Sequence, residues 1–69
     1  MDRFDKAVIE AAELRSRQRE QAARRCAARG APEAAQMLRQ RADSDRKIAE
    51  DTRRAAEWRD QPRTQRPPF

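Results

Sequence analysis

The sequence predicts an all-α fold, an antiparallel two-helix hairpin with one helix over about residues 2–29, a tight turn at 30–31 and a second helix over about residues 32–60. Gly30 is the only glycine, and Pro32 is the only proline before residue 62, in the middle of a helix-favouring chain. Glycine readily adopts the left-handed conformation that closes a helix, and proline suits the first turn of the next helix. The chain is therefore expected to fold back on itself at this point.

The first helix is expected to begin after Asp2, which suits an N-cap, and its apolar residues recur at helical spacing. We predict that its buried stripe consists of Phe4, Val8, Ala11, Leu14, Gln18, Ala22 and Cys26, with Ile9, Ala12, Ala23 and Ala27 as a shoulder. Glu13 and Glu20 each stand four residues before an arginine, a spacing that favours ion pairs within the helix. The apolar face is wider than one partner helix covers, which indicates a second contact surface.

The second helix has fewer large apolar residues, and charged residues interrupt its apolar face. The large ones are Met37, Leu38, Ile48 and Trp58, and the interruptions are Arg41, Asp45 and Thr52. The run from Asp43 to Asp45 is also a capping signal, so a kink or a restart of the helix near Asp43 is an alternative to a continuous helix.

The position of the turn predicts which residues face each other, because the numbers of facing residues in such a hairpin sum to roughly 62. The predicted layers pair Phe4 with Trp58, Val8 with Ala55, and Leu14 with Ile48. The same rule brings Gln18 toward Asp45, with Arg41 in reach. We therefore expect a polar layer in the middle of the contact, which would specify the register or the partner at some cost in stability.

The domain organisation is a single helical hairpin over residues 1–60, followed by a flexible, basic, proline-containing tail over residues 61–69. A chain of 69 residues builds only a small core, and small cores need a further stabilising element. Cys26 is the only cysteine and there is no histidine, which excludes an internal disulfide and argues against a zinc site. We therefore expect a homodimer, in which two hairpins form a four-helix bundle.

Several function classes are not supported by the sequence. No apolar run approaches the ~20 residues of a membrane span, and the first residues lack the apolar segment of a secretory signal. We therefore expect a cytoplasmic protein with no membrane partner. The chain has no histidine, no glycine-rich loop and no evident base beside its two serines, Ser16 and Ser44. We expect no enzymatic activity, no catalytic residue, no cofactor, no metal and no small-molecule substrate.

The net charge is +5, and 15 of the 17 basic residues are arginine. A GC-rich genome also favours arginine and alanine, so the total charge by itself shows no function. The excess is local, because residues 15–29 contain six arginines and one glutamate. Candidate contacts with phosphates or an acidic partner are Arg24, Arg25, Arg29, Arg39 and Arg41. The alternative is that these side chains complement a helix C-terminus and bind no ligand.

Our first hypothesis is a small, non-enzymatic interaction or regulatory protein, a self-associating hairpin that acts as an adaptor through protein–protein contacts. The candidate self-association residues are Phe4, Val8, Ile9, Leu14, Ile48 and Trp58. The alternative is a regulator that binds RNA or DNA through the arginines near the turn and the basic tail. A third hypothesis is a subunit that folds only on a larger partner. Cys26 is interpreted as a packed, inert thiol, with a reactive thiol as the alternative.

Overall fold

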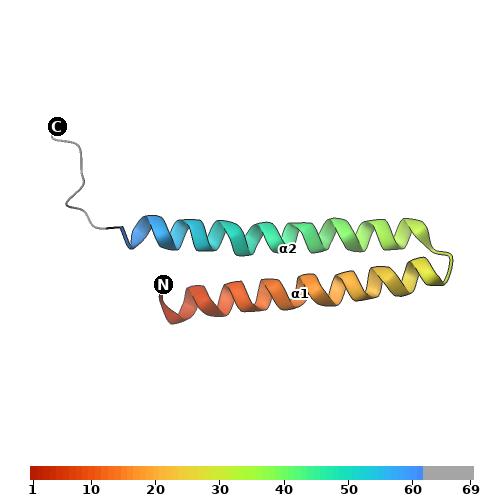
Figure 1. Cartoon of the computed structure of the whole chain (residues 1–69), viewed down its shortest axis with the longest axis horizontal. Helices are drawn as coiled ribbons and strands as arrows, with labels where there is room; N and C mark the ends of the chain where they lie inside the picture. Colours follow the sequence, from red (N-terminus) through yellow and green to blue (C-terminus); the bar gives the residue numbers. More distant parts are fainter. Residues whose placement is uncertain (62–69) are drawn as a thin grey trace, which may run out of the picture.

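The computed structural model describes residues 1–61, which form two antiparallel helices joined by a short turn (Figure 1). Helix α1 spans Arg3–Ala28 and helix α2 spans Pro32–Arg59, and no strand occurs among the described residues. The two helices lie side by side along their lengths, which confirms the predicted hairpin. Helix α2 runs through Asp43 without a break, so the alternative of a restart there is wrong. Of the predicted tail, residues 62–69 lie outside the described residues.

The turn is closed by a hydrogen-bonded glycine motif. Gly30 has a φ of +81°, in the left-handed region that glycine favours. The amide of Gly30 donates to the carbonyl of Ala27 at 3.1 Å, and the amide of Ala31 donates to the carbonyl of Cys26 at 2.8 Å. These two bonds form a Schellman motif, which satisfies carbonyl groups that the end of α1 leaves without helical partners. Pro32 then begins α2, as the sequence predicts.

The N-terminus of α1 is capped by a carboxylate. The amide of Asp5 donates to a carboxylate oxygen of Asp2 at 2.8 Å, which confirms Asp2 as the N-cap. This hydrogen bond favours the charged form and so holds the pKa of Asp2 below its ordinary value of 3.8.

The helices meet along a seam of mostly small side chains. In α1 and α2 the buried or half-buried positions of the seam recur at alternating spacings of three and four residues, the heptad pattern of a coiled coil. The seam residues are Asp5, Ile9, Ala12, Ser16, Arg19, Ala23 and Cys26 of α1, and Ala35, Leu38, Ala42, Asp45, Ala49, Thr52 and Ala56 of α2. Ile9 is the only large apolar side chain that is buried in the described part of the chain.

The predicted buried stripe of α1 is wrong for every residue except Cys26, the only one of the seven that lies in the seam, because the stripe is rotated away from the helix that α1 contacts. Three of the four residues predicted as its shoulder, Ile9, Ala12 and Ala23, are buried in the seam, whereas Phe4 is 74% exposed. The predicted layers fail with it, since Trp58 is 77% exposed and Leu14 and Ile48 are also exposed. The physical reason is that alanines allow the two helices to pack closely, and large side chains would hold them apart.

Within residues 1–61, neither helix carries a stretch long and apolar enough to cross a membrane.

Candidate interaction surface

A polar layer interrupts the seam near its middle, at Asp45. The side chain of Asp45 is only 3% exposed. Ser16, the other buried polar residue in this part of the seam, occupies a seam position of α1. The guanidinium of Arg19 donates to one Asp45 carboxylate oxygen at 2.8 Å, and that of Arg15 donates to the other at 3.4 Å. A polar layer at Asp45 is therefore confirmed, but the partners are two arginines rather than the predicted Gln18 and Arg41, which are both exposed.

Ion pairs between the helices line one edge of the seam. Arg53 donates to Glu13 at 2.5 Å, and Arg46 lies 3.1 Å from Glu20. Both glutamates therefore pair across the seam, rather than within α1 as predicted. Such partly exposed pairs contribute about 0–1 kcal/mol each, so their main consequence is to fix the relative rotation of the helices. We call the surface outside this edge the charged face.

Apolar side chains and arginines share the opposite edge of the seam, where Arg15 lies at seven-residue spacing between Val8 and Ala22. In a heptad, the residue just after one seam position and the residue just before the other lie on opposite sides of the helix. On α1, Glu13 and Glu20 each come just after a seam residue, and Val8 and Ala22 each come just before one, so the two pairs lie on opposite sides. On α2, Arg46 and Arg53 come just after seam residues, and Ile48 and Ala55 come just before them, so these two pairs also lie on opposite sides of the helix. Because the four charged residues pair with one another, the four apolar residues must share the other edge of the hairpin.

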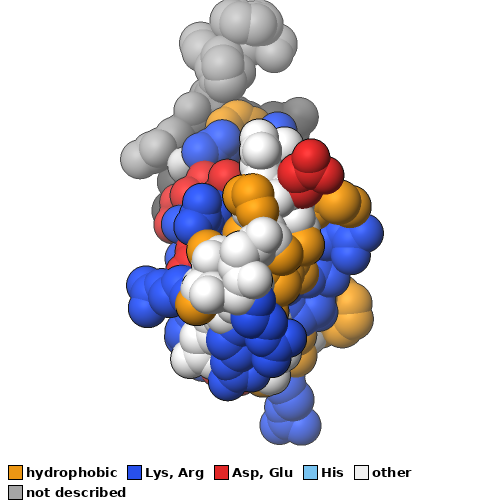
Figure 2. All heavy atoms as spheres, turned by 90° about the vertical axis from the view of Figure 1, so that its right-hand side faces the viewer, with side chains coloured by type: hydrophobic (Ala, Val, Ile, Leu, Met, Phe, Trp, Pro, Cys, Tyr) orange, Lys and Arg blue, Asp and Glu red, His pale blue; other side chains and the backbone are white. Residues whose placement is uncertain are grey.

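This second surface, which we call the apolar face, carries most of the large hydrophobic side chains that the described structure leaves exposed. Phe4, Met37, Ile48 and Trp58 lie on this side by their heptad positions, whereas Leu14 lies on the side of α1 opposite the seam. Seen from the turn end, apolar side chains protrude mainly toward one side of the helix pair (Figure 2). An apolar surface of this extent on a small protein is typical of a contact site for another molecule.

The candidate self-association residues differ in their exposure. Phe4, Leu14, Ile48 and Trp58 lie exposed, and Val8 is half-buried at the edge of the seam. Ile9 is different, because it is buried against Ala12 and Ala49 inside the hairpin. The structure therefore leaves every candidate except Ile9 accessible to a partner.

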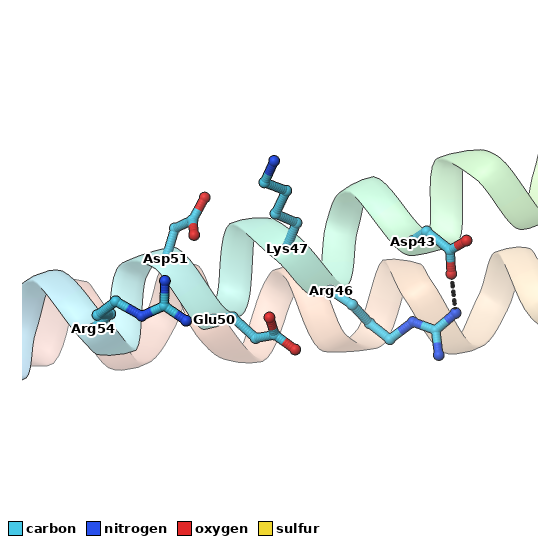
Figure 3. Close-up of a pocket in the computed structure, with 6 residues that line it drawn as sticks. All are labelled: Asp43, Arg46, Lys47, Glu50, Asp51 and Arg54. Carbon is cyan, nitrogen blue, oxygen red and sulfur yellow. Dashed lines mark hydrogen bonds and ion pairs between the residues drawn. The ribbon is translucent and has the colours of Figure 1, made fainter.

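The charged face contains shallow grooves in which basic and acidic side chains are mixed. One groove on α2 is lined by three basic and three acidic residues, namely Asp43, Arg46, Lys47, Glu50, Asp51 and Arg54 (Figure 3). Arg46 extends over α1 and pairs with Asp43, whereas Lys47 points away from α1 (Figure 3). This groove has no excess of either charge with which to select an ionic ligand.

The structure does not gather the five candidate arginines into one patch. Arg24 and Arg39 line a groove on the charged face together with Glu20, Asp43 and Arg46, so acidic groups are mixed with them. By their heptad positions, Arg25 and Arg41 lie on the apolar-face side instead. Arg29 is the C-cap of α1. All five side chains are exposed, and the local positive excess is spread around the turn end, as Figure 2 shows.

Cys26 is half-buried at the turn end of the seam, in keeping with its interpretation as a packed thiol. Within residues 1–61, no three potential ligands among Cys, Asp and Glu gather into a metal-binding group.

No family model matches the chain, and neither the curated proteins nor the solved structures contain a significant match to it.

Proposed function

We propose that this protein is a small, non-enzymatic interaction protein, a helical hairpin that pairs with a second copy of itself through the apolar face and acts as an adaptor or regulator. The observation that carries the proposal is the contrast between the seam and the apolar face. The seam contains six alanines and only one large hydrophobic side chain that is buried, Ile9, whereas most of the exposed large hydrophobic side chains lie outside it on one surface.

The energetics support a second copy as the occupant of this face. Burying a large apolar side chain contributes about 1.5–3 kcal/mol, and the hairpin alone buries only Ile9 among such residues of its described part. A small chain without disulfides or metal generally needs another source of stability. Self-association would provide it, because it would bury side chains such as Phe4, Ile48 and Trp58.

The dimensions also fit a dimer. Helices of 26 and 28 residues are about 40 Å long at 1.5 Å per residue, and two adjacent helices are about 20 Å wide. Such a face covers about 800 Å² per partner, the standard size of a stable protein–protein interface. Two hairpins stacked on this face form a four-helix bundle with both charged faces outside, available for other proteins.

A pair of matched substitutions on α2 tests this proposal. Ile48→Glu places a charge on the apolar face, and Gln40→Glu places the same charge at an exposed position of α2 outside that face. We expect Ile48→Glu to reduce the mass in light scattering at low micromolar concentration to that of one chain, and Gln40→Glu to leave a dimer. An Ile48→Glu variant that associates as tightly as the wild type would overturn the proposal.

Nucleic-acid binding is the second candidate function, and one observation favours it. The half of the hairpin nearest the turn, residues 15–46, holds nine basic and four acidic residues. Phosphate contacts by exposed arginines would make binding strongly salt-dependent. Titration of a duplex DNA and a structured RNA at ~50 mM salt tests this function. Salt-sensitive binding that is lost when Arg24, Arg25 and Arg29 are changed to Ala would support it, and no binding would reject it.

A further inference from the structure

We infer that the two hairpins of the dimer stack antiparallel, so that the turn of each protomer lies over the open end of the other. This inference rests on the proposed self-association and specifies the orientation of the second copy. Two hairpins can also stack parallel on the same face, with both turns at one end, and the distribution of charge and of apolar side chains distinguishes these arrangements.

The two halves of the hairpin carry opposite net charges. The turn half, residues 15–46, has nine basic and four acidic side chains. The open half, residues 1–14 and 47–61, has six basic and eight acidic side chains. Antiparallel stacking places each positive half over a negative half, whereas parallel stacking places the two positive halves together. Complementary potentials across an interface favour the first arrangement, and juxtaposed like charges disfavour the second.

Individual positions on the apolar face follow the same pattern. On α2, Arg41 lies toward the turn from Ile48, and Asp51 lies toward the open end, and both side chains are exposed. A two-fold axis near the middle of the hairpin brings Asp51 of one protomer to the level of Arg41 in the other. In a parallel dimer, each Arg41 would instead lie at the level of its own copy.

The large apolar residues also find counterparts in the antiparallel dimer. Ile48 lies near the middle of α2 and on the apolar face, so it lies close to the two-fold axis and to its own copy. Phe4 and Trp58, at the open end, lie within about one helical turn of the level of the second protomer's Met37 in the turn half. Thioether–aromatic contacts are favourable, and Met37 is the one large exposed hydrophobic residue of the turn half. The exposed large residues of the apolar face, namely Phe4, Met37, Ile48 and Trp58, then contribute to one interface.

Distances between spin labels distinguish the two orientations. In a Cys26→Ala background, Glu33→Cys places one label per protomer at an exposed position in the first turn of α2. Antiparallel stacking predicts a label separation of about 40 Å, because the two turns lie a helix length apart. Parallel stacking predicts about 20 Å, the width of two helix layers. Circular dichroism checks that both labelled and unlabelled variants keep the helical content of the wild type.

A mixed dimer provides the complementary measurement. One protomer carries the label at Glu33→Cys and the other at Glu57→Cys, which is exposed at the open end of α2. The inference predicts a short separation of about 20 Å in this pair and a long one between two Glu33→Cys protomers. The reverse pattern in a protein with the mass of a dimer would overturn the antiparallel orientation and leave the proposed self-association standing. A protein with the mass of a monomer would overturn both.

Discussion

The close packing of the seam predicts that a larger side chain at Ala49 destabilises the hairpin. This residue is 2% exposed and packs with Ile9 and Ala12 in the core cluster of the hairpin. Ala49→Leu would insert three additional carbon atoms where two helices are in contact, and overpacking of this kind costs about 1–3 kcal/mol. The whole stability of so small a core is about 3–5 kcal/mol, so the variant is expected to lose a large share of it.

Urea unfolding followed by circular dichroism at one fixed protein concentration measures this loss, since the stability of a dimer depends on concentration. Ala27→Leu is the matched control, because it makes the same change at an exposed position of α1. Alanine and leucine have similar helix propensities, so the two variants differ mainly in packing. An Ala49→Leu protein as stable as the Ala27→Leu protein would refute the close packing of the seam.

Three further predictions concern the polar layer, the turn and the N-cap. Asp45→Ala removes the buried acceptor of two guanidinium hydrogen bonds and is expected to lower the free energy of unfolding by about 1.5 kcal/mol. Asp43→Ala is the control, because it removes an exposed carboxylate and should have little effect in the same urea assay. Gly30→Ala is expected to cost about 1 kcal/mol because of the positive φ, and Gly30→Asn less, since a Cβ there meets no other atom within 4 Å and only the backbone is strained. The carboxyl of Asp2 is expected to titrate below 3.8 in an NMR pH titration, because its folded-state pKa is depressed. Its contribution to stability is then fully present above pH 3.8 and is lost as the pH falls through the lower folded-state pKa, whereas a titration at or above 3.8 would contradict the cap.

The sequence predicts the hairpin because its two strongest local signals coincide. Gly30 and Pro32 act on the backbone itself, through the left-handed conformation and the missing amide, so their effect depends little on tertiary context. The cap at Asp2 is local in the same sense. The register predicted from the turn is close to the observed one. Facing residues are expected to have numbers that sum to roughly 62, and Arg19 and Asp45, which are paired in the structure, have numbers that sum to 64.

The face of α1 could not be assigned by weighting residues by size. A stripe through Phe4 and Leu14 has the larger hydrophobic side chains, but the hairpin selects small residues at its seam. The overlooked signal is the exact seven-residue spacing of Ala35, Ala42 and Ala49, which continues to Ala56. The regular spacing of small residues identifies the seam between two close helices, whereas the hydrophobicity of the residues alone does not.

The partners of Asp45 could not be derived from the facing-residue rule alone. Gln18 lies at the predicted level along the helix axis, but its neighbour Arg19 occupies the seam position at that level. Because successive residues of a helix point in different directions, Gln18 is exposed. Arginine side chains are long enough to reach the seam from its margin, as Arg15 does, while keeping much of their length in water. The surplus of arginine in this part of the chain is thus used partly inside the hairpin.

The mass of the wild-type protein in solution shows whether the apolar face binds a second copy. Light scattering coupled to size exclusion, or sedimentation equilibrium at low micromolar concentration, is expected to give twice the 8.1 kDa of one chain. A stably folded, helical protein with the mass of a single chain would show that the apolar face does not bind a second copy.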